Sequence, residues 1–135
     1  MLEKLEKIGE KGVLFDTDIL IDYLRGNNYA KEFIPFVLKR FRVYLTLINI
    51  AEIYAGKEMK NLYKREIVEK FLNQFFILDF NTEIAKLAGD LKRDYQLGFS
   101  DAFIASTCLF FDFVLITRNI KDHQKITNLR IFSPY

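Results

Sequence analysis

The chain has 135 residues, half of them hydrophobic, which is the size of one compact domain with a substantial core. Its 20 Lys and Arg nearly balance its 18 Asp and Glu, which excludes a strongly basic protein that coats nucleic acid through net charge alone. The single cysteine excludes an intrachain disulfide framework. No apolar run is long enough to cross a bilayer, and the charged residues 1–7 lack the apolar stretch of a signal peptide, so we expect a cytoplasmic protein without membrane contact.

The predicted elements alternate between short apolar strands and helices. Residues 2–8 have helical spacing, and we treat residues 1–12 as an extension ahead of one domain that spans 13–135. In chain order, strands are predicted at 13–15, 43–46, 76–78, 114–117 and 129–132. Helices are predicted at 19–25, 29–40, 48–55, after Asn61, at 82–95 and at 100–111. This alternation predicts an α/β fold with a mostly parallel central sheet and helices on both of its faces.

Two of the predicted helices have distinctive features. Pro35 removes a backbone donor inside the helix at 29–40 and predicts a kink or a restart there. The helix that Asn61 caps carries an apolar stripe, which favours burial in the core, although such a stripe can also bind a partner helix. The stripe consists of Leu62, Ile67, Val68, Phe71, Leu72 and Phe75.

Asp16 follows the first predicted strand, and ligands of parallel α/β sheets bind at the carboxyl ends of the strands. Taken alone, Asp16 or Asp18 is better explained as a cap of the next helix. Glu52 is the only charged residue from Val43 through Ala55, and a buried carboxylate requires a partner. That partner is either an Arg or Lys elsewhere in the fold or a metal ion.

Two more acids follow later in the chain. Asp101 comes after Ser100, which can cap the helix at 100–111, and the small Ala102 and Ala105 would let this helix start approach the sheet. Asp122 follows the strand at 114–117, although it can also cap a short helix. If these acids converge at one edge of the sheet, they repel each other unless a cation neutralises them. Oxygen ligands select Mg²⁺ or Mn²⁺, and metal-assisted phosphodiester hydrolysis is the chemistry that such a site supports.

Four segments of the sequence resemble the PIN-domain family and, within it, the toxin ribonucleases of VapBC toxin–antitoxin pairs. They are VLFDTDILI at 13–21, IAEI at 50–53, SDAFIA at 100–105 and LITRN at 115–119. All four occur in the family's order and at its usual spacing, and the resemblance extends from Val13 to Pro134.

The resemblance implies that Asp16, Glu52 and Asp101 are the catalytic, metal-binding acids, with Thr17 as the small hydroxyl residue beside the first. Many relatives have Asp where this chain has Asn119, so either Asn119 is a neutral oxygen ligand or Asp122 supplies the fourth acid. The resemblance also implies a Mg²⁺ or Mn²⁺ cofactor, an RNA substrate, a homodimer and a cognate antitoxin that inserts a peptide near the site.

Two alternative functions compete with the ribonuclease. Residues 15–18 also resemble the start of haloacid-dehalogenase-type phosphatases, but no convincing acidic pair follows a late apolar strand, as that fold requires. The second alternative is a PIN-like interaction module that no longer turns over, which Asn119 in place of an acid would support.

Basic residues near the predicted site are candidates for contacts with RNA phosphates, although most charge runs are only solvated faces. Arg118 and Lys121 flank the fourth segment, and Thr17 is a further candidate for substrate contact. A basic cluster follows the Glu52 helix and comprises Lys57, Lys60, Lys64 and Arg65. His123, the sole histidine, has no recognisable Ser or Cys partner and is assigned to the surface.

Overall fold

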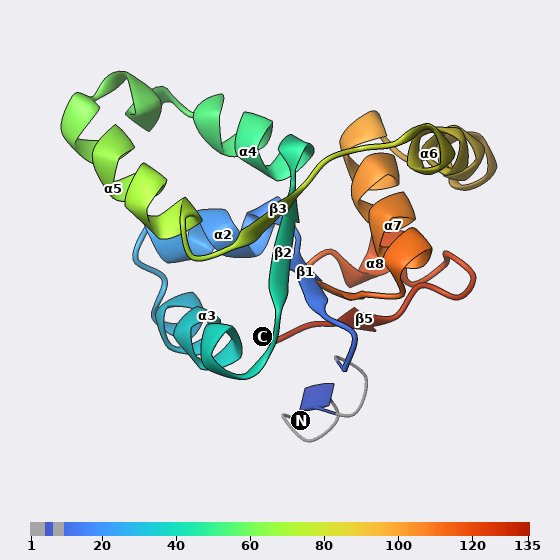
Figure 1. Cartoon of the computed structure of the whole chain (residues 1–135), viewed down its shortest axis with the longest axis horizontal. Coiled ribbons are helices and arrows are strands. Elements are labelled where there is room, and N and C mark those ends of the chain that lie inside the picture. The colour runs from blue at the N-terminus through green and yellow to red at the C-terminus, as the bar shows by residue number, and fades with distance from the viewer. Residues whose placement is uncertain (1–4, 7–9) are drawn as a thin grey trace.

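The computed structural model describes residues 5, 6 and 10–135, which form a five-stranded sheet covered by helices (Figure 1). The sheet has the order β3-β2-β1-β4-β5 and every pairing in it is parallel, so the predicted α/β fold is confirmed. Its strands are β1 (Val13–Phe15), β2 (Val43–Thr46), β3 (Phe76–Leu78), β4 (Val114–Ile116) and β5 (Ile131–Phe132). The helices are α2 (Thr17–Leu24), α3 (Asn28–Arg40), α4 (Leu47–Tyr54), the 3₁₀ helix η1 (Lys57–Lys60), α5 (Leu62–Leu72), α6 (Thr82–Tyr95), α7 (Phe99–Phe111) and α8 (Ile120–His123).

Side chains of the central strands alternate between two separate cores. Val13 and Phe15 of β1 pack with α2, α3 and α5 on one face, whereas Leu14 packs with α7 on the other. Helix α6 packs on α7 through a third cluster that includes Ala88 and Ala102. Because both faces of β1 and β4 are covered, these strands consist of apolar residues only, as expected for a parallel sheet.

Several local predictions are wrong in detail. Helix α3 continues through Pro35, so a restart of the helix at that residue is wrong. Helix α7 starts one residue early, at Phe99 with Gly98 as its N-cap, so Ser100 lies in the first turn and does not cap the helix. Only part of the predicted apolar stripe of α5 is buried in the core. Leu62 and Ile67 are 81% and 47% exposed, whereas its other members are buried.

The predicted helix at 2–8 lies mostly outside the described residues. Leu5 and Glu6 are helical, and Leu5 is buried against the core that contains Val13 and Phe15. The separation into an extension at 1–12 and a domain at 13–135 therefore stays a prediction.

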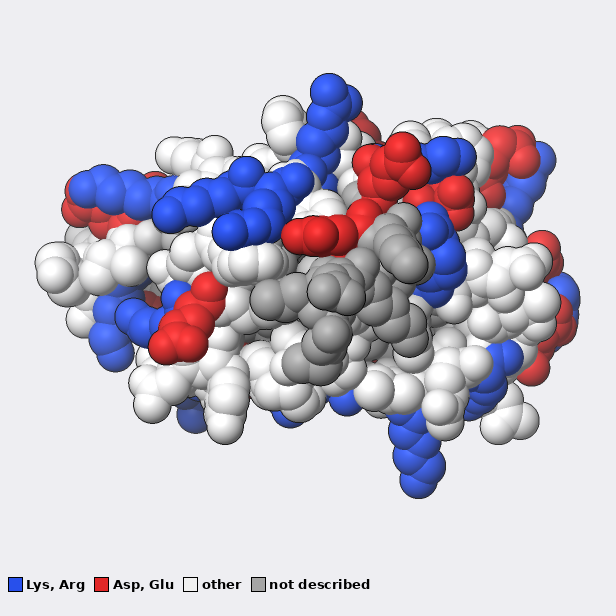
Figure 2. Space-filling model, turned by 90° about the horizontal axis from the view of Figure 1, so that it is seen from below, with Lys and Arg blue, Asp and Glu red and all other residues white. Residues whose placement is uncertain are grey.

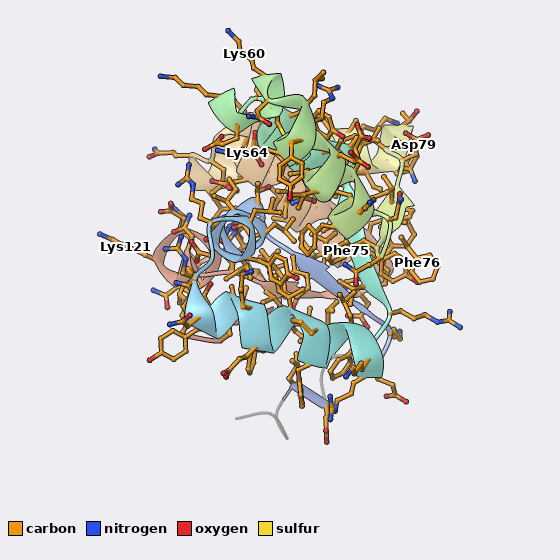
Figure 3. All side chains as sticks on the ribbon, turned by 90° about the vertical axis from the view of Figure 1, so that its left-hand side faces the viewer. Lys60, Lys64, Phe75, Phe76, Asp79 and Lys121 are labelled. Carbon is orange, nitrogen blue, oxygen red and sulfur yellow. The ribbon has the colours of Figure 1, made fainter. Side chains whose placement is uncertain are left out.

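The described surface mixes charges of both signs. On the face shown in Figure 2, Lys and Arg side chains are interspersed with Asp and Glu. Among the described residues, no helix is both long enough and apolar enough to cross a bilayer. The sheet ends at the edge strand β3, where Phe75 is buried but the next residue, Phe76, is 59% exposed (Figure 3).

Candidate metal centre

The topology creates a crevice between β1 and β4. The chain adds β2 and β3 on one side of β1 and then crosses to add β4 and β5 on the other side, which makes this the switch point of the sheet. Asp16 follows β1 directly, and Thr117 follows β4 directly. The Thr117 hydroxyl donates a hydrogen bond of 2.7 Å to Oδ2 of Asp16, so the ends of the two strands are joined at this point.

Asp16 is held rigidly at the end of its strand. It is 7% exposed, caps helix α2 and accepts a 2.8 Å hydrogen bond from the Thr17 amide through Oδ1. Burial raises its pKa, but His123, Thr117 and Thr17 more than offset this effect, so the pKa of Asp16 is lowered overall. The capping role expected from the sequence is therefore real, and the same carboxylate also faces the crevice.

Glu52 extends from helix α4 into the crevice, and a hydrogen bond from Thr17 on α2 fixes its position there. The Thr17 hydroxyl donates a 2.7 Å hydrogen bond to Oε1 of Glu52 and accepts one of 2.9 Å from the Asn49 side-chain amide. Asn49 is fully buried and forms a capping box with Thr46 at the start of α4. Its amide also donates to the Phe15 carbonyl at 3.0 Å, which ties α4 to the end of β1.

Asp101 approaches from the first turn of α7 and lies close to His123. The Nε2 atom of His123 is 3.9 Å from Oδ1 of Asp101 and 3.5 Å from Oδ2 of Asp16. The assignment of His123 to the surface is wrong, because its side chain is fully buried. Burial lowers the pKa of His123, but Asp16, Asp101 and Asp122 outweigh burial and raise that pKa overall.

The three acids repel one another. Burial and the charge of Asp16 raise the pKa of Asp101, and the nearby Asp122 adds to this effect while His123 opposes it. Burial also raises the pKa of Glu52, against the hydrogen bond from Thr17 and with contributions from Asp16 and Asp101. For Asp101 and Glu52, burial is thus the main cause of the raised pKa and the neighbouring carboxylates add to it, so a bound cation would favour their ionised forms.

The residues of the crevice fit a divalent cation. Among the described residues, Asp16, Asp101 and His123 each offer one ligand atom, and these atoms all lie within 4.8 Å of one another. Glu52 and Asn119 line the same open cleft. A set of carboxylates with room for water is the usual environment of Mg²⁺ or Mn²⁺.

Asn119 and Asp122 differ in their position relative to the cleft. Asn119 lines it, whereas Asp122 is exposed and does not line it. The side-chain amide of Asn119 donates a 3.0 Å hydrogen bond to Oδ2 of Asp122, and its backbone amide donates to the Thr117 hydroxyl at 2.9 Å. Asp122 thus orients Asn119.

The two basic candidates for substrate contact also differ. Arg118 binds Asp22 at 2.7 Å through Nε and at 3.3 Å through Nη2, so its charge is already matched. Lys121 is exposed on α8 and projects away from the ribbon, as Lys60 does at another place on the surface (Figure 3).

The sequence contained signals for two of the site residues that our predictions missed, Asn49 and Thr117. Asn49 follows Thr46 at the spacing of a capping box, which marks it as the first turn of a helix. Thr117 follows a buried strand just as Asp16 does. His123, in contrast, lies among polar neighbours, and nothing in its local sequence indicates burial.

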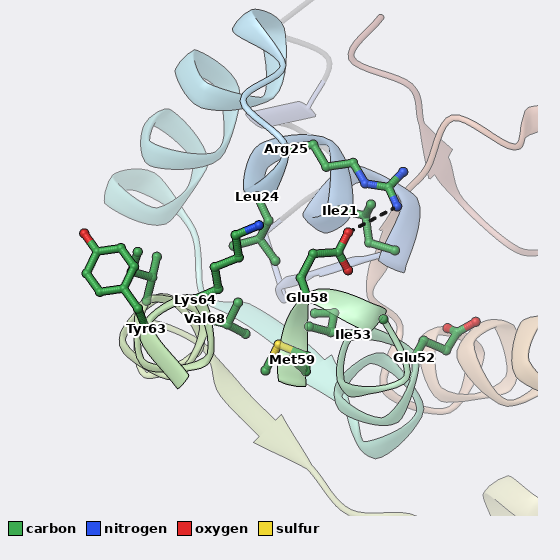
Figure 4. Close-up of a pocket in the computed structure, with 12 residues that line it drawn as sticks. Ile21, Leu24, Arg25, Glu52, Ile53, Glu58, Met59, Tyr63, Lys64 and Val68 are labelled. Atoms are coloured by element: carbon green, nitrogen blue, oxygen red, sulfur yellow. Dashed lines mark ion pairs between the residues drawn. The ribbon is translucent and has the colours of Figure 1, made fainter. Parts of the chain in front are cut away.

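An apolar groove borders the metal cleft. It is lined mainly by α2, α4, η1 and α5, and an ion pair of 4.0 Å between Arg25 and Glu58 crosses part of it (Figure 4). Ile21 and Glu52 line both the groove and the cleft. A molecule bound in the groove could therefore reach the acids. The apolar lining is provided by Ile21, Leu24, Ile53, Met59, Tyr63, Ile67 and Val68.

Comparisons with known proteins identify a matching family and similar sequences. The family model described as PIN domain matches residues 13–128. The chain is 30% identical to Ribonuclease VapC2 of Methanocaldococcus jannaschii over 93% of this chain and 95% of the relative. It is 31% identical to Ribonuclease VapC10 of Mycobacterium tuberculosis over 80% of this chain and 83% of the relative.

Solved structures with the same fold include complexes. A chain of a toxin–antitoxin complex from Klebsiella pneumoniae is 30% identical, with a TM-score of 0.78 over 92% of this chain and 98% of that chain. A chain of DNA-bound VapBC from Salmonella typhimurium shares the fold at 21% identity, with a TM-score of 0.79 over 91% of this chain and 98% of that one.

Proposed function

Because this chain belongs to the PIN-domain family, we propose that it is a metal-dependent endoribonuclease and the toxin of a type II toxin–antitoxin pair. The observation that carries the proposal is the meeting of Asp16, Glu52 and Asp101 in one cleft at the switch point of the sheet. Relatives of similar length are named ribonucleases, and one similar solved structure is a toxin–antitoxin complex. The family match leaves the phosphatase alternative without support.

We assign Asp16 and Asp101 as direct metal ligands and Glu52 as a ligand or the general base. A bound Mg²⁺ or Mn²⁺ would supply a Lewis acid and a water of lowered pKa for attack on the phosphodiester. Thr17 and Thr117 hold the carboxylates of Glu52 and Asp16 in fixed orientations. Burial raises the pKa of Glu52, which makes this carboxylate a stronger proton acceptor than an ordinary glutamate.

For the fourth position we favour Asn119 over Asp122. Asn119 lines the cleft and its amide nitrogen is engaged by Asp122, which leaves its carbonyl oxygen available as a neutral ligand, directly or through water. Asp122 would then act by orienting Asn119 and by adding negative charge near Asp101.

The apolar groove is where we place a segment of the cognate antitoxin. Most of its lining residues are apolar, they include the exposed Tyr63 and Ile67, and the groove shares Glu52 with the cleft. A segment that covers the groove can extend to the acids and exclude RNA from them. Exposed cations such as Lys60 and Lys121 would contact the RNA phosphates. We expect the protein to act in the cytoplasm, because its substrate would be RNA and its one cysteine, Cys108, is free and buried.

The test is cleavage of a set of structured RNAs by antitoxin-free protein with Mg²⁺, with Mn²⁺ or with EDTA. We expect cleavage to depend on the metal and to fall by at least about 100-fold in Asp101→Asn. Mutating a residue that only hydrogen-bonds to a metal ligand already lowers activity by about 10- to 100-fold, and Asp101 is proposed as a ligand itself. Asp79→Asn is the matched control, since Asp79 is an exposed acid outside the cleft (Figure 3), and it should cleave normally.

The alternatives give different results in the same assay. A folded protein that cleaves none of the RNAs with any metal would favour the non-catalytic interaction module. Release of phosphate from small phosphomonoesters without RNA cleavage would revive the phosphatase.

A further inference from the structure

His123 is a buried imidazole without hydrogen bonds, placed beside two acids of the metal cleft. Its side chain is fully buried, and neither Nδ1 nor Nε2 has a hydrogen-bond partner. Most buried polar groups in proteins have a hydrogen-bond partner, so such a group calls for a specific explanation. Helix α8, which carries it, lies next to α7, which carries Asp101 (Figure 1).

The separations around Nε2 match those between ligands of one ion. Nε2 lies 3.5 Å from Oδ2 of Asp16 and 3.9 Å from Oδ1 of Asp101. Both distances exceed that of a good N–H···O hydrogen bond, which is about 2.9 Å. Nε2 and the ligand oxygens of Asp16 and Asp101 all lie within 4.8 Å of one another, close enough for all three to contact one ion.

We infer that His123 is a third protein ligand, through Nε2, of the ion held by Asp16 and Asp101. This inference rests on the metal site of the proposed function but does not depend on the RNA substrate. Mg²⁺ requires oxygen ligands, whereas first-row transition ions, of which Mn²⁺ is the weakest binder, also accept an imidazole nitrogen. The site of this chain therefore prefers Mn²⁺ over Mg²⁺.

The experiment measures the nitrogen ligand directly. Because His123 is the only histidine in the sequence, untagged protein labelled with ¹⁵N-histidine reports on this one ring. Mn²⁺ is added, and electron spin-echo envelope modulation is recorded for labelled and unlabelled protein. We expect modulation from a directly bound nitrogen, with the pattern changed by the label.

Affinity measurements on variants provide a second readout. Calorimetric titration should show that His123→Phe raises the Mn²⁺ dissociation constant by at least about 10-fold and raises the Mg²⁺ constant less. Lys121→Ala, an exposed change on the same helix, is the matched control and should bind Mn²⁺ normally. His123→Asn is tested beside it in case the larger ring prevents folding, which circular dichroism would reveal.

The outcomes separate this inference from the proposed function. Mn²⁺ that binds without histidine nitrogen coupling, or the absence of Mn²⁺ binding to folded protein, overturns the inference, even if RNA is cleaved. Nitrogen coupling in a protein that cleaves no RNA supports the inference while the proposed function fails.

Discussion

Asp18 lies beside Asp16 in the cleft, and one of its carboxylate oxygens, Oδ1, is buried without a partner. Burial and the charge of Asp16 raise its pKa from 3.8 to about 6, although Arg118 opposes them. The folded pKa thus exceeds the unfolded value, so the folded chain binds more protons between about pH 4 and pH 6. Stability from this group is complete below that range and is lost as the pH rises through it.

We therefore predict that Asp18→Asn stabilises the metal-free protein at pH 7.5 but not at pH 4. The expected gain in the free energy of unfolding is about 1–2 kcal/mol. The full pKa shift converts at about 1.36 kcal/mol per pKa unit, and we take about half of that value because Asp18 is partly exposed to solvent. Urea unfolding of both proteins with EDTA at each pH measures the difference. An equal gain at both pH values would contradict the explanation by ionisation.

Thr117 connects the two strand ends, because its buried hydroxyl donates to Asp16 and accepts from the Asn119 amide. Thr117→Val leaves both partners unpaired, and we predict a loss of about 1–3 kcal/mol in stability and about 10- to 100-fold in RNA cleavage. Thr107→Val is the control, because the buried Thr107 hydroxyl bonds only within α7, to the Phe103 carbonyl. Equal losses of cleavage in the two variants would mean general destabilisation.

The sequence revealed the acids of the site but not all of the residues around them. Asp16 and Asp101 stand out because they interrupt or follow apolar segments, and Glu52 is isolated in one. His123 lies among Lys121, Asp122, Gln124 and Lys125, a polar setting that is typical of a surface. Its burial depends on how α8 folds back toward α7, which is a tertiary effect that local patterns do not record.

Helix α5 presents Ile67 to the apolar groove, while Leu62, on the same helix, is more exposed but does not line the groove. We predict that Ile67→Glu weakens antitoxin binding by at least about 10-fold, because a charge would enter an apolar contact. Leu62→Glu should leave binding unchanged, and both variants should still cleave RNA. Calorimetry with the cognate antitoxin measures the affinity, and equal loss in both variants would place the partner elsewhere.

Elements of this fold are predictable where one pattern dominates. The strands read as short apolar runs, and the helix at 82–95 was predicted with the bounds of α6, because Asn81 caps it clearly. The start of α7 was misplaced because Gly98 gives no side-chain cap, whereas Ser100 is a preferred cap residue. The 3₁₀ helix η1 was missed because its four residues, three of them charged, show no apolar periodicity.

The whole molecule exposes apolar residues on the edge strand β3, where Phe76 and Ile77 are 59% and 44% exposed. Such an edge is a site of association unless it is covered. We predict a homodimer in solution, with a mass by light scattering near twice the 16.0 kDa of one chain. Ile77→Lys should lower the dimer fraction, whereas Ile120→Lys, at a similarly exposed isoleucine on α8, should not. A single-chain mass at all concentrations would contradict this prediction.

The site also depends on the completeness of the chain. Asp16 and Thr117 are 101 residues apart in sequence, and β4 fills the place between β1 and β5. A product that terminates before β4 has an uncovered β1, no hydroxyl to orient Asp16 and no His123. If the protein is a toxin, such partial products are expected to be harmless to the cell that makes them.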